Sequence, residues 1–507
     1  MSAPLPPVHP TVVHMLAEAA RRHPGGEALV CGEERLNYAE YLGAVGGFAR
    51  ELQGRGVAGG RVALLLGNCV DLAIATFAVQ AAGAQVVALN PGYTAHELEP
   101  ILADAAPALV LHGPDTAAAL APIAERLGIP GTLAVGPGAR RLAAVPPAPL
   151  PALPDPESPS TLQYTGGTTG RSKGVELIHR TVSLNVSQRE ALLPTAPGDE
   201  RVLAITPLFH VYATAMCLYL AAYCRGALVI LPRYHPQLVL EAIARERITL
   251  FSGSPTIFNG LMGYEGFANT DFSSLRLCFS GASALAPATL DRWEAATGAR
   301  VCEGFGLSES GPVLAFNPRH GVRKPGSVGV PVPDTRIEIV DTEAGTRVLP
   351  PREPGEIRVR GPQLMRGYRN LPDQTAAALR NGWLYTGDIG WLDEDGYLHI
   401  SDRKKDMAIV SGFNVFPREV EEALLLHPAV AEAAVVGTPD SYRGEALVAF
   451  VVPRPGQAVA AAPLEQHLQD RLAGYKVPRR YQALPALPKT VVGKVDKQAL
   501  RQLAAGN

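Results

Sequence analysis

Short apolar runs alternate with helix-length segments through the first 113 residues of the sequence. The apolar runs occupy residues 61–67, 85–90 and 108–113, and the helix-like segments occupy residues 69–84 and 95–106. Short apolar strands separated by helices are typical of a parallel sheet that is covered on both faces. A similar alternation resumes in the middle of the chain, so the sequence predicts an α/β fold.

At 507 residues the chain is too long for a single hydrophobic core, and it divides into regions of different character. The proline-rich stretch 144–160 can be neither a helix nor a central strand, so we interpret it as a surface linker between two α/β units. After Gly329, short strand-like segments predict a β-rich subdomain. We expect a large N-terminal domain (1–402) of parallel α/β subdomains plus this β-rich subdomain, and a small α+β C-terminal domain (403–507).

The balance of charges argues against some kinds of partner. The 46 basic and 48 acidic residues leave a formal net charge of -2, which argues against a nucleic acid or an anionic membrane as the main partner. Residues 202–224 carry no charge over a length that could span a bilayer, but Pro207 and His210 interrupt them. We interpret them as a buried strand, loop and helix. We therefore expect no transmembrane segment, and we leave peripheral membrane contact open.

Neither the N-terminus nor the cysteines indicate export. Residues 1–22 contain no basic segment followed by an apolar core, so no signal peptide is evident. The six cysteines lack CxxC spacing, and we interpret them as small buried hydrophobic residues in a reducing compartment. We therefore expect a cytoplasmic location.

The stretch LQYTGGTTGRSKG (162–174) has a composition that suits a polyphosphate. Glycines let backbone N–H groups approach an anion, hydroxyls donate to phosphate oxygens, and Lys173 supplies a compact positive charge. The spacing is not that of the common P-loop, because Gly174 follows the lysine and the hydroxyl-bearing threonines precede it. The alternative interpretation is a flexible Gly/Thr turn.

This loop resembles the phosphate-loop signature of the adenylate-forming superfamily, which includes acyl-CoA synthetases, peptide-synthetase adenylation domains and beetle luciferases. Further motifs similar to those of the family follow in the family's order over essentially the whole chain. They are PLFH (207–210), SGASAL (280–285), GFGLSES (304–310), GWLYTGDIGWLDEDGYLHISDRKKD (382–406), SGFNVFPREVEEAL (411–424) and PKTVVGKVDKQAL (488–500). The details are most similar to bacterial long- and medium-chain fatty acyl-CoA synthetases.

The resemblance implies a reaction in two steps. A carboxylate attacks the α-phosphate of ATP and pyrophosphate leaves, and the thiol of CoA then attacks the acyl-AMP. Such chemistry needs positioning and charge neutralisation more than covalent help from the protein. The implied partners are a small carboxylic acid, ATP and CoA, with Mg²⁺ as a cofactor.

The resemblance also implies roles for residues at the ATP site. The loop threonines and Lys173 would hold the β- and γ-phosphates, and Glu309 and Thr168 would bind magnesium, which prefers oxygen ligands. Phe305 takes the place of an aromatic residue that stacks on adenine, where the family more often has tyrosine. Asp388 would take both ribose hydroxyls, with Arg403 assisting there and at the phosphate. The residues implied to bind ATP or CoA are Thr165, Gly166, Gly167, Thr168, Thr169, Gly170, Lys173, Gly281, Ala282, Phe305, Gly306, Ser308, Asp388, Arg403 and Gly412.

The resemblance also implies roles for two residues of the expected C-terminal domain. Lys494 matches the lysine that bridges the substrate carboxylate and the α-phosphate, although a lysine at such a place is ordinarily solvated surface charge. Gly412 matches a backbone position of the pantetheine channel, where a side chain would obstruct CoA. Both would act on one acyl carbon in different steps, so the domain would be mobile and rotate about Lys405. The implied catalytic residues are Lys494, Glu309, His210 and Arg403.

The acid itself is less well defined by the sequence. Amino-acid adenylation domains carry an Asp shortly after the PLFH position, but no carboxylate follows His210 in VYATAMCLYLAAY, so an amino acid is not expected. His210 is interpreted as a gate at the acyl pocket, with a plain buried histidine as the alternative. One methylene discriminates by only about 10–200-fold, so we expect a range of medium-to-long fatty acids.

Three other functions stay open at this point. The chain could be an aryl-acid (coumarate-like) CoA ligase. It could also be a fatty-acyl-AMP ligase that loads an acyl carrier protein, although the insertion usual in such ligases is not evident. A non-catalytic nucleotide-binding scaffold would be supported by the loss of Lys173, Glu309, Asp388 or Lys494, but all four are present.

Overall fold

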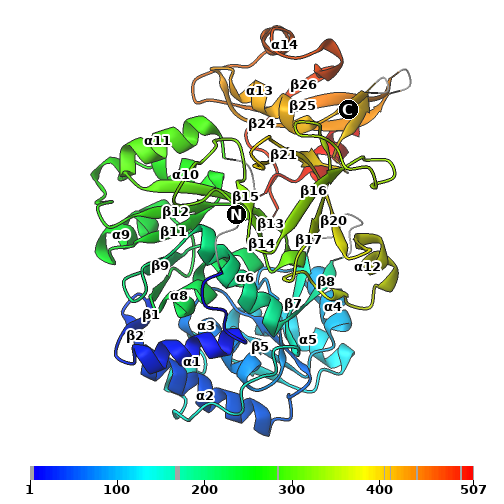
Figure 1. Cartoon of the computed structure of the whole chain (residues 1–507). Coiled ribbons are helices and arrows are strands. Elements are labelled where there is room, and N and C mark those ends of the chain that lie inside the picture. Colours follow the sequence, from blue (N-terminus) through cyan, green and yellow to red (C-terminus); the bar gives the residue numbers. More distant parts are fainter. Residues whose placement is uncertain are drawn as a thin grey trace. The chain divides into compact units, whose positions relative to one another are not determined.

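The structure of the protein is a computed structural model, and it describes residues 5–165, 172–281, 285–404, 406–410, 413–440, 443–490 and 494–505. The chain folds into two compact units, which we describe separately (Figure 1). The first contains Met1–Arg336 and Arg360–Leu384, and the second contains Ile337–Val359 and Tyr385–Asn507. The domain boundary expected between residues 402 and 403 lies inside the second unit and stays a prediction.

A largely parallel sheet occupies one part of the first unit. Among the described residues it has seven strands in the order β18-β8-β7-β4-β3-β5-β6. The pairs β4–β7, β3–β4, β3–β5 and β5–β6 are parallel, whereas β8 is antiparallel to both of its neighbours. The strands are β3 (Arg61–Leu65), β4 (Gln85–Leu89), β5 (Leu109–His112), β6 (Thr132–Ala134), β7 (Pro159–Thr165), β8 (Lys173–Ile178) and β18 (Gly367–Tyr368). The three strands predicted at 61–67, 85–90 and 108–113 are therefore confirmed.

Helices lie where the sequence predicts them between these strands. The segment 69–84 contains α3 (Val70–Ala81), and the segment 95–106 contains α4 (Ala95–Ala105), which begins at a capping box of Thr94 and Glu97. The other helices of this unit that are longer than one turn are α1 (Val12–Arg22), α2 (Tyr38–Gly54), α5 (Ala117–Leu127), α6 (His179–Leu192), α8 (Leu220–Cys224), α9 (Pro236–Arg245), α10 (Pro255–Met262), α11 (Pro287–Thr297) and α12 (Pro372–Ala378).

The side chains of β3 are buried on both faces of the sheet. Val62 and Leu64 belong to the largest core cluster, which also contains buried residues of α1, α2 and α3, whereas Ala63 and Leu65 pack with residues of α4 and α5. Successive side chains of a strand point to opposite faces, so a strand that is apolar throughout must be covered on both. This is the physical reason why the apolar runs of the sequence became central strands.

A second sheet of the first unit has nine strands among the described residues, in the order β15-β14-β13-β12-β11-β9-β10-β1-β2. Its middle strands, from β1 to β13, pair in parallel, and α9, α10 and α11 lie on one side of it (Figure 1). The strands are β1 (Glu27–Cys31), β2 (Glu34–Asn37), β9 (Arg201–Ala204), β10 (Ala227–Ile230), β11 (Leu250–Gly253), β12 (Leu277–Ser280), β13 (Arg300–Gly306), β14 (Val313–Phe316) and β15 (Val330–Pro331).

The uncharged segment 202–224 forms a buried strand, a loop and short helices, as predicted. It contains most of β9, a turn of helix, α7 (Val211–Ala213), a π-helix (Thr214–Tyr219) and α8. No helix in the described part of the chain is long and apolar enough to cross a membrane.

The proline-rich stretch 144–160 has little regular structure and is largely exposed, but it does not join two α/β units as predicted. It connects β6 to β7, which belong to the same sheet. Its backbone lies against the glycines of α2: a Cβ atom at Gly46 would lie 2.0 Å from the carbonyl oxygen of Ala148. The stretch therefore packs against α2 on its way between two strands of one sheet, and we call it the strap.

The second unit contains most of a small sheet and the C-terminal region. The small sheet has the order β16-β17-β20-β19, with β21 paired to β20, and it corresponds to the predicted β-rich subdomain. The C-terminal sheet has the order β23-β22-β25-β24, with β26 paired to β25, and separate apolar clusters contain the residues on its two faces. The predicted fold class, parallel α/β sheets in a large N-terminal part followed by a smaller α+β part, is confirmed.

The bounds of these remaining elements follow. They are β16 (Arg336–Val340), β17 (Gly355–Arg360), β19 (Leu379–Arg380), β20 (Trp383–Leu392), β21 (Leu398–Arg403), β22 (Ala408–Val410), β23 (Phe413–Val415), α13 (Pro417–Leu425), β24 (Val430–Asp440), β25 (Gly444–Pro453), α14 (Ala461–Gln469), β26 (Arg480–Ala483) and α15 (Lys497–Ala505).

Candidate active site

Two predicted phosphate-binding residues face each other at the loop end of the β7–β8 hairpin. Thr165 is the last residue of β7 and Lys173 is the first of β8, and they are direct partners in the antiparallel register. The intervening positions, among them Gly166, Gly167, Thr168, Thr169 and Gly170, lie outside the described residues. The hairpin therefore holds the two ends of the predicted loop side by side.

Tyr368 contacts both the predicted cation and the predicted carboxylate of the phosphate site. Its hydroxyl donates a hydrogen bond of 2.8 Å to Oε1 of Glu309, and the Nζ atom of Lys173 lies 4.9 Å from the centre of its ring. The strand that carries Tyr368, β18, is paired to β8. Sequence analysis missed this residue, because its two-residue strand has no periodicity and its partner Glu309 is 59 positions away.

The surroundings of Tyr368 keep its hydroxyl protonated. Burial, the charge of Glu309 and the hydrogen bond to that carboxylate together raise its pKa well above the ordinary value for tyrosine. The hydroxyl therefore acts as a hydrogen-bond donor at any physiological pH, and it orients the Glu309 carboxylate. The backbone helps as well, because the amide of Met365 donates a 2.8 Å bond to the carbonyl oxygen of Glu309.

The oxygen donors at this site suit a magnesium ion that is shared with substrate phosphates. No group of three or more His, Cys, Asp or Glu side chains that could hold a metal occurs among the described residues. Mg²⁺ is commonly held by one or two carboxylates together with substrate phosphates. Glu309, which shares its neighbour Tyr368 with Lys173, fits such a shared site and does not fit a metal cage made only of protein. The second predicted ligand, Thr168, lies outside the described residues.

The predicted adenine-site residues lie at the carboxyl ends of two neighbouring parallel strands. Gly281 follows β12, while Phe305 and Gly306 are the last two residues of β13. Ligands of open α/β sheets bind outside the carboxyl ends of strands, so this edge suits a nucleotide. A Cβ atom at position 281 would lie 3.0 Å from the ring of Tyr212, so glycine there permits close packing. Ser308 begins the short helix that carries Glu309, whereas Ala282 lies outside the described residues.

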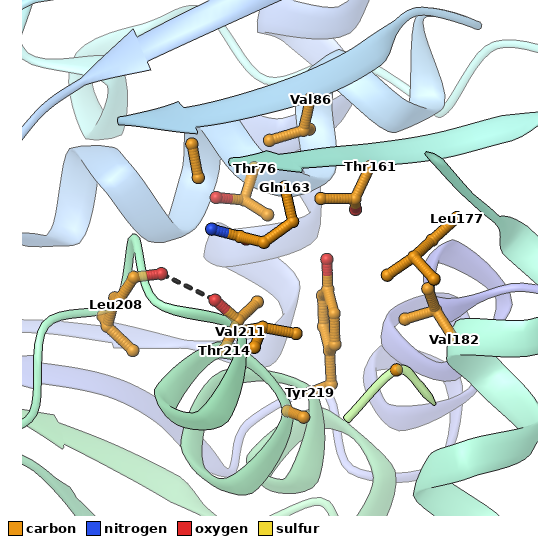
Figure 2. Close-up of a pocket in the computed structure, with 13 residues that line it drawn as sticks. Thr76, Val86, Thr161, Gln163, Leu177, Val182, Leu208, Val211, Thr214 and Tyr219 are labelled. Atoms are coloured by element: carbon orange, nitrogen blue, oxygen red, sulfur yellow. Dashed lines mark hydrogen bonds between the residues drawn. The ribbon is translucent and has the colours of Figure 1, made fainter. Parts of the chain in front are cut away.

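A pocket with mostly apolar lining is formed in part by sequence neighbours of the predicted gate residue His210, and we call it the pocket beside His210 (Figure 2). His210 is half-buried and caps the turn of helix α7, with its Nδ1 atom accepting a 3.3 Å bond from the amide of Tyr212. Its neighbours in sequence, Leu208 and Val211, contribute to the wall of the pocket. The pocket is lined by Thr76, Val86, Ala88, Thr161, Gln163, Leu177, Val182, Leu208, Val211, Thr214, Ala215, Tyr219 and Gly311. Gly311, another of these lining residues, lies two positions after Glu309 in the sequence.

Three predicted residues come together within the second unit. Asp388 on β20 and Arg403 on β21 are direct partners in the antiparallel register, and Nε of Arg403 lies 3.3 Å from Oδ1 of Asp388. Surrounding protein atoms and the charge of Arg403 lower the pKa of Lys494, while the charge of Asp388 opposes this shift. Lys494 as a whole residue is exposed to solvent.

The predicted hinge and CoA-channel positions, Lys405 and Gly412, lie outside the described residues. The residues on either side of the predicted hinge are held within the second unit. Lys404 forms a 2.8 Å ion pair with Glu356 on β17, and Asp406 accepts a 2.5 Å bond from Arg501 on α15. The hinge and channel roles stay predictions.

Two family models match this chain. The model described as AMP-binding enzyme matches residues 16–369, and the model described as AMP-binding enzyme C-terminal domain matches residues 419–494. Together they include most of both units.

Relatives of known name extend over nearly the full chain. A long-chain-fatty-acid–CoA ligase of Bacillus subtilis is 36% identical, covering 98% of this chain and 95% of the relative. A feruloyl-CoA synthase of an Amycolatopsis species is also 36% identical, covering 95% of this chain and 97% of the relative. Among solved structures, ATP-bound MatB from Rhodopseudomonas palustris is 31% identical with a TM-score of 0.90, covering 97% of this chain and 98% of that one. The anthranilate CoA ligase AuaEII in complex with anthranoyl-AMP is 28% identical with a TM-score of 0.91, covering 99% of both chains.

Proposed function

The chain belongs to the AMP-binding enzyme family, and from that membership we propose that it is an acid–thiol ligase that activates fatty acids with ATP and transfers them to CoA. The products would be acyl-CoA, AMP and pyrophosphate. The observation that carries the proposal is the similarity, at 36% identity over both units, to a ligase named for long-chain fatty acids and CoA.

The phosphate end of ATP is assigned to the first unit. Lys173 offers a point charge for phosphate oxygens, and the pairing of Thr165 with Lys173 sets the width of the loop between them. Glu309, oriented by Tyr368, would hold Mg²⁺ together with the phosphates. Magnesium supplies neutralisation of the phosphate charge. Thr168, Thr169, Gly166, Gly167 and Gly170 complete the proposed loop.

The sugar and the reacting carboxylate are assigned to residues of the second unit. The buried Asp388 carboxylate would accept hydrogen bonds from the ribose hydroxyls, and its ion pair with Arg403 orients it. Lys494, whose ammonium feels both charges, would bridge the substrate carboxylate and the α-phosphate. Positive charge there stabilises the negative charge that develops as the carboxylate attacks phosphorus.

CoA is the proposed acceptor of the acyl group. The relatives with curated names given above are a CoA ligase and a CoA synthase, which supports CoA over a carrier protein. The thiol would approach along a channel at Gly412, and the C-terminal region, proposed as residues 403–507, would rotate about Lys405 between the two steps. A cytoplasmic location and the absence of a nucleic-acid partner stay predictions.

An aryl acid is the second candidate substrate. The feruloyl-CoA synthase relative is as similar in identity to this chain as the fatty-acid ligase of Bacillus subtilis. Fatty acids remain the first candidate because most side chains that line the pocket beside His210 are apolar.

The test is a pyrophosphate-release assay with a panel of saturated fatty acids and aryl acids, with and without CoA. We expect ATP- and acid-dependent pyrophosphate release, and a thioester detectable by mass spectrometry only when CoA is present. Higher kcat/KM for aryl acids than for every fatty acid would establish the second candidate. No pyrophosphate release with any acid would refute the proposed function.

A further inference from the structure

The pocket beside His210 contains one large side chain that projects into it. The ring of Tyr219 stands among the lining residues, and its hydroxyl points toward Thr161 and Gln163 (Figure 2). Only 3% of Tyr219 is exposed to solvent. Most of the other lining side chains are small or aliphatic, such as Ala215 and Val86. Tyr219 therefore occupies space that an aliphatic ligand would otherwise take.

A hydrogen bond holds the hydroxyl of Tyr219 in place. Nε2 of Gln80 donates a 3.0 Å bond to this hydroxyl and a 2.9 Å bond to Oγ of Ser160. Gln80 is fully buried, and its Oε1 atom has no hydrogen-bond partner among the described residues. If Tyr219 moved away, Nε2 of Gln80 would lose one of its two hydrogen-bond acceptors. Losing a hydrogen bond from a buried amide costs free energy, so this bond holds the tyrosine in place.

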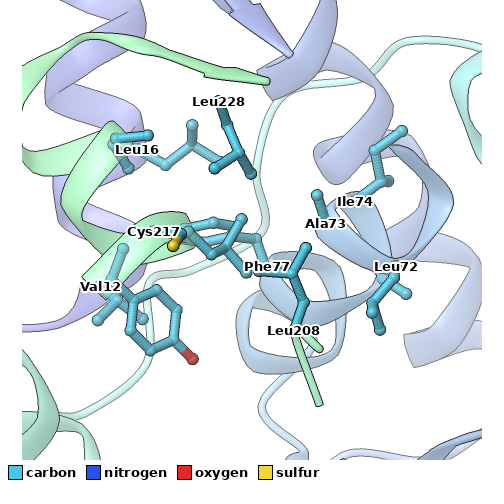
Figure 3. Packing of buried hydrophobic residues seen from close by; sticks show 14 of the residues in the cluster. Val12, Leu16, Leu72, Ala73, Ile74, Phe77, Leu208, Cys217 and Leu228 are labelled. Carbon is cyan, nitrogen blue, oxygen red and sulfur yellow. The ribbon is translucent and has the colours of Figure 1, made fainter. Parts of the chain in front are cut away.

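The ring of Tyr219 is also held by packing. The ring of Phe77 meets it edge to face, with centres 5.7 Å apart, and Phe77 meets Tyr41 in the same way at 5.9 Å. Phe77 lies in the buried core with Leu208 and Cys217 (Figure 3). Phe77 and Gln80 are three positions apart on α3, so one face of one helix holds both the ring and the hydroxyl.

The backbone places Tyr219 in the pocket by an unusual turn. Tyr219 ends a π-helix that begins at Thr214, and π-helical turns are rare and frequent at functional sites. This π-helix contributes Thr214, Ala215 and Tyr219 to the wall of the pocket. This wall continues to Val211, next to His210.

We infer that Tyr219, held by Gln80 and Phe77, sets the length of the acyl chain that the enzyme accepts. The inference rests on the proposed function, with this pocket holding the acyl chain. A methylene that fits changes kcat/KM by about 10–200-fold, so a fixed ring in the pocket is enough to define an upper length. Chains that end before the ring keep the Gln80–Tyr219 bond, whereas longer chains must break it.

The test compares kcat/KM for saturated acids of increasing length in wild type, Tyr219→Ala and Tyr219→Phe. Tyr219→Ala removes the ring, so we expect the optimum to move to longer acids. We compare kcat/KM for a longer acid with kcat/KM for the acid that the wild-type enzyme prefers. In Tyr219→Ala this ratio should rise on the order of tenfold or more. Tyr219→Phe keeps the ring and should keep the optimum. The matched control is Tyr223→Ala, which makes the same change one turn further along the chain, outside the pocket lining.

Ala215→Leu gives an independent reading if Tyr219→Ala does not fold. It adds bulk to the same wall, so we expect the optimum to move to shorter acids. A folded Tyr219→Ala enzyme with the wild-type length profile would overturn the inference, and so would an Ala215→Leu enzyme with that profile. Failure of the proposed function would look different, because the wild-type enzyme would then activate no acid at all.

Discussion

Tyr368 places its hydroxyl on Glu309 and its ring against Lys173, so a single side chain contacts two residues of the proposed phosphate site. A carboxylate that is to share a cation with phosphates must face them before the substrate arrives. Hydrogen bonds to charged groups are worth about 1.5–3 kcal/mol, which is enough to hold one carboxylate rotamer. Tyr368 is thus a positioning residue in the proposed reaction.

The first prediction concerns this hydrogen bond. Tyr368→Phe keeps the ring beside Lys173 but removes the bond to Glu309, so we expect acyl-AMP formation to fall about tenfold or more and to need more Mg²⁺. Pyrophosphate release measured over a range of Mg²⁺ concentrations tests both effects. Tyr385→Phe, which removes a hydroxyl that donates to the carbonyl oxygen of Gly345, is the control. An unchanged dependence on Mg²⁺ would argue against the positioning role.

The second prediction concerns the charge of Lys494. Its pKa is lowered by surrounding protein atoms and by Arg403, so the ammonium loses its proton at a lower pH than an ordinary lysine does. Because the protonated form is the one that can bridge the carboxylate and the phosphate, acyl-AMP formation should decline as the pH rises through this lowered pKa. The rate of pyrophosphate release measured against pH tests it. The residual rate of pyrophosphate release by Lys494→Ala should not fall at alkaline pH. If the rates of wild type and variant fall together, the fall is caused by the titration of another group.

At the scale of elements, the strap 144–160 and α2 show how a helix and an irregular segment can pack closely. The glycines of α2 remove side chains where the backbone of the strap approaches: Cβ atoms at Gly46 and Gly47 would lie 2.0 and 2.1 Å from carbonyl oxygens of Ala148 and Pro146. The amide of Ala148 also donates a 3.1 Å bond to the carbonyl oxygen of Gly43. Three helical glycines, each unfavourable for a helix in isolation, are explained by this contact.

The third prediction tests this packing. Gly46→Ala should lower stability by about 1–3 kcal/mol, because the new methyl group meets backbone that cannot move away like a flexible side chain. Gly54→Ala is the matched control in the same helix, since a Cβ atom there meets nothing within 4 Å. That variant should be neutral or slightly stabilising. Thermal melts of both variants decide the matter, and an equal effect of the two would contradict the contact.

At the scale of the whole molecule, the proposed reaction uses residues that belong to different units. Lys173 and Glu309 belong to the first, and Asp388, Arg403 and Lys494 belong to the second. The proposed reaction has a first step at the α-phosphorus of ATP and a second step at the acyl carbon, and each step is proposed to use a different group from the C-terminal region. Lys494 is proposed to serve the first step and Gly412 the second, so variants at the two positions should have opposite effects.

The fourth prediction is that Lys494→Ala loses acyl-AMP formation but still converts supplied acyl-AMP and CoA to the thioester. The lysine neutralises charge only while the carboxylate attacks phosphorus, so the second step does not need it. Measuring each half-reaction separately tests this. Equal loss of both would contradict the assignment of Lys494 to one step.

The fifth prediction is the complement. Gly412→Leu should still form acyl-AMP, whereas transfer to CoA should be lost, because a side chain in the proposed channel would obstruct the pantetheine arm. Single-turnover formation of acyl-AMP and of thioester gives the two readouts. A variant with intact transfer would exclude the channel role of this position.

The sequence alone was sufficient for features that depend on local order. The strands at Arg61–Leu65, Gln85–Leu89 and Leu109–His112 follow from short runs of apolar residues between helix-length segments, an alternation typical of a doubly covered parallel sheet. The family, and with it Lys173, Glu309, Asp388 and Lys494 as site candidates, followed from motifs of neighbouring residues. Nothing in these features requires knowledge of distant contacts.

Only the tertiary structure decided which distant residues meet. Tyr368 became a partner of Glu309 and Lys173 because β18 pairs with β8, and a two-residue strand leaves no pattern in the sequence. The strap 144–160 was predicted as a linker, yet its ends belong to one sheet, since strand order is not encoded by the composition of a loop. Tyr219 reached the pocket beside His210 through a π-helical turn and a hydrogen bond to a helix residue 139 positions away. The sequence gives the chemistry of each side chain, but which side chains contact one another depends on the surfaces that the fold brings together.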